Sequence, residues 1–319
     1  MYIRRNRVKE KLQNGELVLG METWIRDPRL VELAGQAGFD FAHIEFEHVA
    51  RNWESVENMV RAAELAGLTP LFRTEQCIDG SPPLNQIIKA LKLGVKILLV
   101  PQVDTAEQAR KVVAATKFPP AGQRGISTTD RSATALFPTP EVALDVRRYA
   151  DESNQETMVW LLIESPEGVA NIDSILAVEG VDVVGFGHQD YSLSAGETND
   201  GSSRVHEARE TVYQAVKKAG KTMLWVTPDP EEVGRQAARG VNLFLTGTDL
   251  NLMDTEMRKL ATKARGCQEV NDDREITQRD DNDTEHVEIR PEPHVGAPVA
   301  VEGIPAGGEG CRGRCSGDP

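Results

Sequence analysis

The sequence lacks any apolar run long enough to cross a membrane, and it is poor in cysteine. Basic residues occur between Met1 and Lys11, but no apolar stretch follows them, so we expect no secretory signal there. Of the four cysteines only Cys77 lies in the first 260 residues, which excludes a disulfide framework. Cys311 and Cys315 have no further ligand residues nearby for a metal site. A reducing compartment fits this usage, and we expect a cytoplasmic protein.

Positive charge is also in short supply. The chain has 36 Lys and Arg residues against 50 Asp and Glu residues, which gives a net charge of −14. Nucleic acids and anionic membranes are bound through basic surfaces, so we expect neither as a partner. A small acidic substrate is still compatible with this charge, because a few local Arg or Lys side chains can hold a carboxylate.

The chain contains eight apolar runs of strand length, each followed by an amphipathic stretch or a long connection. The runs are Leu17 to Met21, Asp40 to Ile44, Thr69 to Arg73, Lys96 to Val100, Met158 to Glu164, Asp182 to Phe186, Thr222 to Val226 and Asn242 to Thr246. Glycines that stop helices follow several of the amphipathic stretches, at Gly38, Gly67, Gly94, Gly220 and Gly240. Eight strand–helix repeats predict an α/β fold, a (β/α)8 TIM barrel of about 250 residues.

Two segments depart from this repeat. Residues Pro119 to Ser153 separate the fourth and fifth strands and include a helix-like stretch near Pro140 to Ala150. We expect this long segment to close over a substrate or to contact another subunit. After about Gly266 the sequence becomes first acidic and then rich in Pro and Gly, and it cannot bury enough apolar surface to order itself. We predict a catalytic barrel over residues 1–265 and a disordered tail over residues 266–319.

Two carboxylates stand where predicted strands end. Glu164 ends the run from Met158, and Asp190 follows 26 residues later, just after the strand that ends at Phe186. In a parallel barrel both side chains would point into one mouth, where oxygen ligands suit Mg²⁺ or Mn²⁺. Taken singly, Glu164 could equally be a charge on the rim and Asp190 a helix cap. The combination of the two predicts a metal site.

A candidate base and a candidate oxyanion-binding residue stand at two other strand ends. His48 follows the second strand, with Glu45 and Glu47 beside it, and a carboxylate near an imidazole can orient it and raise its basicity. Arg73 ends the third strand, and its guanidinium suits a carboxylate or an enolate oxygen. His48 could instead be a solvated polar residue, and Arg73 could bridge acids of the rim. Barrel enzymes assemble sites from several strand ends, which favours the catalytic interpretation.

Together these residues resemble the HpcH/HpaI aldolase/citrate lyase family, the class II 2-oxo acid aldolases that include 4-hydroxy-2-oxoheptanedioate and 2-dehydro-3-deoxyglucarate aldolases. The resemblance covers roughly residues 15 to 262. It is carried by Ala37-Gly38-Phe39-Asp40 with Glu47-His48, Leu71-Phe72-Arg73, Val100-Pro101-Gln102-Val103 with Thr105-Ala106-Glu107, Pro119-Pro120 with Gly122 and Arg124-Gly125, Ile163-Glu164-Ser165-Pro166-Glu167, and Gly180-Val181-Asp182 with Gly187 and Asp190.

The resemblance implies a phosphoenolpyruvate/pyruvate-type barrel that cleaves carbon–carbon bonds of 2-oxo acids. Glu164 and Asp190 would hold a divalent ion, with Mg²⁺ expected ahead of Mn²⁺ or Co²⁺. His48 would be the acid and base, and Arg73 would bind the enolate oxygen. The backbone at Gly187 and Gln189 would receive the substrate carboxylate. A homo-oligomer, a hexamer or trimer of dimers, would be the expected assembly.

Four positions differ from the family pattern. Glu45 stands where many members have Asp, and Lys92 replaces an Asp that raises the basicity of the catalytic His, so we expect a weaker base. Leu162 stands where a substrate-binding Gln is frequent, and His188-Gln189 replaces Pro-Ala. These differences support an alternative function, a carbon–carbon condensing or decarboxylating enzyme that uses an oxaloacetate- or pyruvate-derived enolate. A non-catalytic binding barrel is a third hypothesis.

Overall fold

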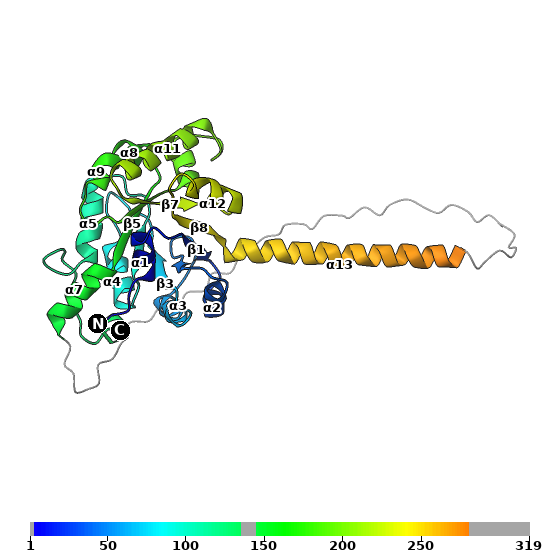
Figure 1. Ribbon diagram of the computed structural model, residues 1–319, viewed down its shortest axis with the longest axis horizontal. Coiled ribbons are helices and arrows are strands. Elements are labelled where there is room, and N and C mark those ends of the chain that lie inside the picture. The colour runs from blue at the N-terminus through cyan, green and yellow to red at the C-terminus, as the bar shows by residue number, and fades with distance from the viewer. Residues whose placement is uncertain (1–2, 135–144, 281–319) are drawn as a thin grey trace, which may run out of the picture. The chain divides into compact units, whose positions relative to one another are not determined.

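The computed structural model describes residues 3–134 and 145–280, and of residues 267–280 the backbone alone. Within these residues eight parallel strands close into a barrel in sequence order, with helices outside them (Figure 1). The strands are β1 Val18–Thr23, β2 Phe41–Ile44, β3 Thr69–Arg73, β4 Ile97–Val100, β5 Met158–Ile163, β6 Val183–Phe186, β7 Thr222–Val226 and β8 Leu243–Thr248. The predicted (β/α)8 barrel is therefore confirmed.

The strand predictions differ from the structure only at the ends. β3 and β7 have the predicted bounds, and four other strands start or stop one residue inside them. β1 and β8 extend two residues beyond the predicted ends, to Thr23 and Thr248. The extension of β1 brings Glu22 into the barrel wall, opposite His43 of β2. This register matters for the site, because it places two polar side chains on neighbouring strands at the same level.

The helices that follow the strands cover the outside of the barrel. They are α2 Pro28–Gln36, α3 Trp53–Leu65, α4 Leu84–Lys92, α5 Ala106–Thr116, α8 Pro166–Ala170, α9 Ile172–Leu176, α10 His188–Ser194, α11 Ser203–Lys218 and α12 Pro230–Ala237. After β8 comes α13 Asp249–Asp280, whose residues 250–266 are exposed. Local signals start them: Thr105 caps α5 through a capping box with Gln108, and Ser165 caps α8. No described helix is both long and apolar enough to cross a membrane.

Helix α1 was not predicted from the sequence. α1, Arg7–Gln13, begins at the cap Asn6 and lies at the end of the barrel where the strands start. Its Val8 is fully buried within the apolar cluster that fills the barrel, and Leu12 packs against the same cluster. This segment is rich in basic residues, but its two apolar side chains close one end of the barrel.

The barrel interior is filled by apolar side chains. Trp160 of β5 contacts Phe41 of β2 edge-on, with ring centroids 5.4 Å apart, and both are fully buried. Gly20 of β1 lies directly against the Phe41 ring, where a Cβ atom would come within 1.9 Å of it. A second, larger cluster joins the outer faces of the strands to the helices. The strands are therefore buried on both faces, as their nearly unbroken apolar sequences require.

The long segment between β4 and β5 lies at the strand-start end. α5 runs back from the end of β4, so the residues after Thr116 lie where β5 begins. Phe118, Ala133, Tyr149 and Ala150 form a buried cluster there with Ile3. The segment contains α6 Arg131–Thr134 and α7 Val146–Glu156, and residues 135–144 of the predicted Pro140 to Ala150 stretch lie outside the described residues. The described residues of this buried cluster therefore lie at the opposite end of the barrel from the strand ends, and closure over a substrate or contact with another subunit stays a prediction.

The C-terminal part divides from the rest of the chain. Contacts within the chain separate residues Met1–Ala261 from Thr262–Pro319. α13 starts where the last predicted helix starts, at Asp249, and continues to Asp280. The predicted tail from residue 266 thus begins inside this helix, and residues 281–319 lie outside the described part. The boundary at residue 265 and the disorder beyond it stay predictions.

The close approach of Gly20 to Phe41 leads to a stability prediction. Replacing Gly20 with Ala inserts a methyl group where no space exists, so the free energy of unfolding should fall by about 1–3 kcal/mol. The control is Gly234→Ala in α12, where nothing lies within 4 Å of the added Cβ and the helix gains propensity. Urea unfolding of both variants measures the difference. Equal stability of the two variants would contradict this packing.

Candidate active site

A cavity of about 170 Å³ opens where the strands end. All six residues that the sequence singled out line it: His48, Arg73, Glu164, Gly187, Gln189 and Asp190. Trp24, Glu22, His43 and His188 contribute further polar groups, and Phe186 and five aliphatic side chains complete the lining. Residues from different strands thus meet in one mouth at the end of the barrel where barrel enzymes carry their sites.

Glu164 is buried rather than exposed on the rim, with only 3% of the residue accessible. Its Oε2 accepts the backbone N–H of Gln102 at 2.9 Å, and its Oε1 lies 3.8 Å from Nη2 of Arg73. Burial raises the pKa of Glu164 to about 7, although the Arg73 charge opposes this. Gln102 adopts a left-handed backbone with φ of 53° to direct its N–H there. The sequence did not predict that the backbone of Gln102 would bind the Glu164 carboxylate.

Asp190 lies in the first turn of α10, but it is not the cap of that helix. The N-cap is Gly187, so the helix-cap alternative for Asp190 is wrong. Its charge is near enough to raise the pKa of both Glu164 and Glu47. Gly187 passes so close to Glu164 that a Cβ atom would lie 2.0 Å from Oε1. A glycine is therefore needed between the two acids.

The backbone N–H groups of Gly187 and Gln189, both predicted to bind the substrate carboxylate, differ in whether they are free to do so. The N–H of Gly187 already donates to the carbonyl of Ile163 at 3.1 Å, so it is not available to a ligand. Gln189 lies in the first turn of α10, whose N–H groups have no acceptor within the helix. The structure therefore supports Gln189 and not Gly187 as a backbone donor in this cavity.

Arg73 connects four carboxylates. Its Nη2 is 2.5 Å from Oε2 of Glu47 and 3.8 Å from Glu164, and its Nη1 is 3.5 Å from Oε2 of Glu45 and 4.0 Å from Oε1 of Glu22. Burial alone would lower the pKa of Arg73, but these charges outweigh it and raise the pKa. Arg73 therefore does bridge acids, as the alternative held, and it also lines the cavity, as the catalytic interpretation requires.

His48 faces the cavity between an acid and an aromatic ring. Its Nε2 lies 3.5 Å from Oε2 of Glu47, and its ring stacks on Trp24 with centroids 6.0 Å apart. Glu45 was expected beside this imidazole, but it lies under the loop instead. Its Oε1 accepts the backbone N–H groups of Glu47 at 2.7 Å and His48 at 3.0 Å. Glu45 thus shapes the backbone that carries His48, and Glu47 is the acid next to the ring.

Lys92 was expected to weaken His48 as a base. It is the last residue of α4, just before the start of β4, and so lies at the opposite end of the barrel from His48. Its neighbour Leu93 accepts a hydrogen bond from Arg131, a residue of the segment at that end. The predicted effect of Lys92 on His48 within one chain is therefore wrong, because helices that follow strands run back to the strand-start end.

Glu22 and His43 are residues of the cavity that sequence reasoning missed. Glu22 lies one residue beyond the predicted end of the first strand, and His43 lies inside the second predicted strand. Nδ1 of His43 lies 3.5 Å from Oε1 of Glu22, and Nε2 lies 3.5 Å from Oε2 of Glu45. A carboxylate at the end of one apolar run and a histidine inside another were the available signals.

Two sets of side chains offer ligands for a divalent ion. Glu164 provides a buried carboxylate and Asp190 a half-buried one, and the nearest cation to Oε1 of Glu164 is the guanidinium 3.8 Å away. Glu22, His43 and Glu45 form a second set whose ligand atoms lie within 4.8 Å of one another. Arg73 already stands beside that second set. The excess of acids and the hard oxygen donors make the first set a fit for Mg²⁺ or Mn²⁺.

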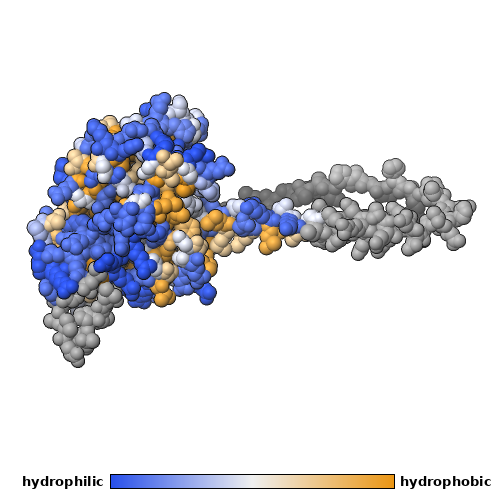
Figure 2. Space-filling view, viewed as in Figure 1, coloured by the Kyte–Doolittle hydropathy of each residue, from blue (hydrophilic) through white to orange (hydrophobic). Residues whose placement is uncertain are grey.

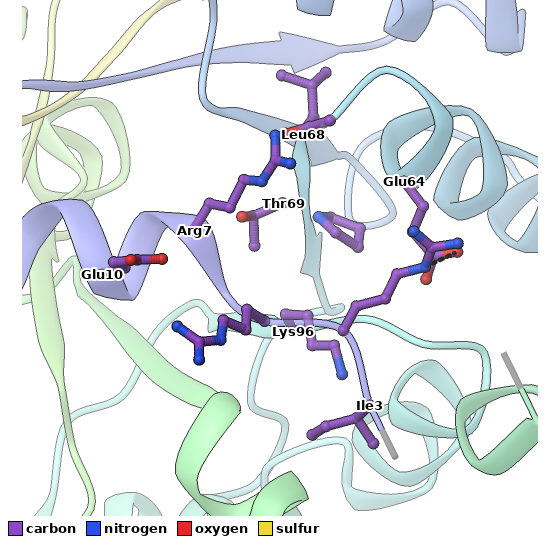
Figure 3. Close-up of a pocket in the computed structure, with 11 residues that line it drawn as sticks. Ile3, Arg7, Glu10, Glu64, Leu68, Thr69 and Lys96 are labelled. Carbon is purple, nitrogen blue, oxygen red and sulfur yellow. Dashed lines mark hydrogen bonds and ion pairs between the residues drawn. The ribbon is translucent and has the colours of Figure 1, made fainter. Parts of the chain in front are cut away.

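A larger cavity of about 410 Å³ lies at the strand-start end, lined by Arg7 and Glu10 of α1, by Thr69 at the start of β3 and by Lys96 before β4 (Figure 3). None of the predicted site residues lines it. Its charged groups also have partners: Nε of Arg4 is 3.5 Å from Glu64, and Arg7 donates to the carbonyl of Gly67. The smaller cavity is therefore the candidate active site, because it collects the acids, the base and the cation.

Comparisons with known proteins cover the part of the chain that contains this cavity. The family described as HpcH/HpaI aldolase/citrate lyase matches residues 24–254. The hydroxypyruvate/pyruvate aldolase of Pseudomonas aeruginosa is 32% identical over 262 residues, which are 82% of this chain and 93% of that protein. The matched region includes all the residues that line the cavity except Glu22.

Solved structures show the same fold. An HpcH/HpaI aldolase from Desulfitobacterium hafniense superposes with a TM-score of 0.73 at 29% identity, covering 81% of this chain and 96% of that chain. The citrate synthase SbnG superposes with a TM-score of 0.71 at 28% identity, covering 83% of this chain and 98% of that chain. The similarity thus extends over the whole barrel.

The buried carboxyl of Glu164 leads to a prediction about metal-free protein. In the folded protein the Glu164 carboxyl keeps its proton up to about pH 7, whereas in the unfolded chain it loses the proton near pH 4.5. The folded state therefore binds more protons in this range, and the free energy of unfolding falls as the pH rises through it. Glu164→Gln should remove that loss and be more stable than the parent by about 3 kcal/mol at pH 8, with little difference at pH 4. Urea unfolding with a chelator present measures both.

The exposed Glu107→Gln variant is the control, and its stability relative to the parent should not change with pH. A difference between the Glu164→Gln variant and the parent that is the same at pH 4 and pH 8 would show that Glu164 ionises normally.

Proposed function

Because this chain belongs to the HpcH/HpaI aldolase/citrate lyase family and is an aldolase-type carbon–carbon lyase, we propose that it cleaves 4-hydroxy-2-oxo acids with the help of a divalent ion. The products would be a pyruvate-type 2-oxo acid and an aldehyde. The observation that carries this proposal is the convergence of Glu164, Asp190, Arg73 and His48 on one cavity. No Schiff-base lysine lines that cavity among the described residues, and this chemistry needs none.

Glu164 and Asp190 would hold the ion, Mg²⁺ in the first place and Mn²⁺ or Co²⁺ as alternatives. When bound, such an ion supplies a Lewis acid that draws electrons from the 2-oxo group. Gln102 fixes the orientation of Glu164 through its backbone N–H, and Gly187 leaves room for it. The backbone N–H of Gln189 would bind the substrate carboxylate. These residues therefore bind and orient the 2-oxo acid half of the substrate.

His48 and Arg73 would act on the reacting atoms. His48 takes the proton of the 4-hydroxyl group as the bond between C3 and C4 breaks, and the electrons of that bond form the enolate. The guanidinium of Arg73 stabilises the negative charge that develops on the enolate oxygen. The proton then returns to C3 and gives the methyl group of pyruvate. Glu47, 3.5 Å from the ring, would stabilise the protonated imidazole.

We also propose a homo-oligomer, with a hexamer or trimer of dimers as the expected form, and a cytoplasmic location. Large apolar side chains are exposed along the first turns of α13, and Figure 2 shows them as a group of apolar atoms. They are Leu250, Leu252, Met253, Met257 and Leu260. Exposed apolar groups of this kind support a subunit contact. The cysteine content supports the location.

The metal requirement can be tested with the two acids. Pyruvate release from 4-hydroxy-2-oxo acids should require added Mg²⁺ or Mn²⁺ and should stop with a chelator. Glu164→Ala and Asp190→Ala should each lower kcat/KM by at least about a hundredfold, because the ligands are lost. Glu107→Ala on the outer face of α5 is the matched control and should keep full activity. Full activity of both site variants after chelation would exclude the proposal.

The role of His48 predicts a different result. His48→Ala should lower kcat by about a hundredfold to ten-thousandfold, the usual contribution of general acid–base catalysis, while Mn²⁺ still binds in calorimetric titration. Loss of metal binding in this variant would instead make His48 a ligand. Oxaloacetate and acetyl-CoA are tested in parallel, since a citrate synthase is among the similar structures. The aldolase proposal expects no release of free CoA.

A further inference from the structure

The mechanism above leaves two polar residues of the cavity without a task. Glu22 on β1 and His43 on β2 are register partners, and both line the cavity. His43 is 1% exposed, and neither of its ring nitrogens has a hydrogen-bond partner among the described residues. Burying a polar ring without partners costs free energy, so some interaction has to offset it.

The barrel interior next to this pair is apolar. Phe41, Leu71 and Trp160 form a continuous apolar cluster there with residues of the other strands. Aliphatic side chains also line the cavity on β4, β5, β7 and β8, namely Leu99, Leu162, Leu224, Val226 and Leu245. The cavity thus offers carbon contacts beside its charged and polar groups. A ligand that reaches Glu22 would need a polar group at that point and carbon against the aliphatic side chains.

A second metal ion explains this polar side less well. The ligand atoms of Glu22, His43 and Glu45 lie within 4.8 Å of one another. However, Nη1 of Arg73 is 3.5 Å from Glu45 and 4.0 Å from Glu22, so a cation already stands there. A divalent ion beside the guanidinium would meet strong repulsion in this buried place. A neutral hydroxyl group meets none.

We propose that Glu22, positioned by His43, binds a hydroxyl group of the aldehyde, so that the preferred acceptor is a short aldehyde with a single hydroxyl group. This inference rests on the proposed aldolase function and adds the class of its second substrate. Glu22 would contact the substrate, and His43 would hold the Glu22 carboxyl through a hydrogen bond at Nδ1. Glu22 is thus a binding residue, and His43 is a positioning residue.

The position of Arg73 separates the two halves of the substrate. Its Nη2 points to Glu164, which belongs to the 2-oxo acid side, and its Nη1 points to Glu22. Glu22 and Glu164 thus lie next to different nitrogens of the guanidinium, so the aldehyde half would extend past Nη1 towards Glu22. The aliphatic side chains offer no partner to further hydroxyl groups. A chain with several hydroxyl groups would leave some of them unpaired in this lining, which is costly.

The ionisation of the pair agrees with this role. Burial, with the nearby Glu45 charge, raises the pKa of Glu22 to about 7, so its carboxyl can both donate and accept a hydrogen bond. Burial also lowers the pKa of His43 to about 3, which keeps the ring neutral with one donor and one acceptor. The group that faces Glu22 is therefore a neutral ring, and the nearest cation is Arg73.

The experiment compares two acceptors that differ by one hydroxyl group, glycolaldehyde and acetaldehyde, in aldol addition to pyruvate with Mg²⁺. The parent protein should prefer glycolaldehyde in kcat/KM. Glu22→Leu should lower that preference by about tenfold to a hundredfold, mainly through a higher KM for glycolaldehyde, whereas Glu22→Gln should keep most of it. Glyceraldehyde should be the poorest acceptor, and Leu162→Gln should improve it. The exposed Glu231→Gln is the matched control.

His43 is tested by the same comparison. His43→Leu should raise the KM for glycolaldehyde and leave the KM for acetaldehyde and the KM for pyruvate unchanged, which a general loss of structure would not do. His43→Gln should restore part of the preference, since its amide can donate to Glu22. Thermal unfolding of each variant checks that the barrel is folded. Equal KM changes for both aldehydes would overturn the role of His43.

Two further measurements keep the inference separate from the proposed function. Exchange of the pyruvate methyl protons with deuterated water, followed by NMR without any aldehyde, reports enolate formation alone. If the parent protein shows no exchange, the aldolase proposal fails. If exchange is normal but Glu22→Leu keeps the parent's preference, the inference about Glu22 fails. Calorimetric titration with Mn²⁺ should give one bound ion per chain. If the parent binds two ions and Glu22→Leu binds only one, Glu22 is a metal ligand and the inference is wrong.

Discussion

The guanidinium of Arg73 among four carboxylates is the interaction on which the rest of the mouth depends. It reaches Glu22 on β1, Glu45 and Glu47 after β2, and Glu164 at the end of β5. In a buried setting, removal of one partner of such a network leaves uncompensated charge, which is far more costly than on the surface. The ends of four strands are therefore fixed relative to one another by one side chain from β3.

The network is also unbalanced, and this imbalance explains the chemistry of the cavity. One positive charge faces the four acids it contacts and Asp190 nearby, so some of the acids have to keep protons or share a divalent ion. Burial raises the pKa of Glu22, Glu47 and Glu164, each to about 7. In Glu45 the charge of Arg73 and the backbone N–H of His48 outweigh burial, and its pKa is lowered. The acid that shapes the loop thus stays charged, while the acids of the cavity can respond to a ligand.

Sequence reasoning located the barrel and most of the candidate site, because both follow from short-range patterns. Apolar runs fixed the strands, with β3 and β7 predicted to the residue, and polar residues at strand ends identified His48, Arg73, Glu164 and Asp190. The errors concern which side chains meet across strands. Glu45 contacts the backbone of His48 rather than its ring, a matter of loop geometry that spacing does not reveal.

Other misses have equally definite causes. The pairing of Glu22 with His43 depends on the register between β1 and β2, which no single strand encodes. The left-handed backbone of Gln102 is unusual for a residue with a side chain, so the sequence gives no warning of it. The expected contact of Lys92 with His48 was an avoidable error, because a helix that follows a strand in a barrel returns to the end where the strands start. The same rule places the beginning of the segment from Pro119 to Ser153 at that end.

The helix α1 has a consequence for how molecules travel through the protein. Val8 and Leu12 seal the barrel at the strand-start end, and apolar side chains fill the space above them. Among the described residues the barrel is therefore plugged at that end. Substrates and products have to enter and leave where the strands end, and none of them can cross the protein along the barrel axis.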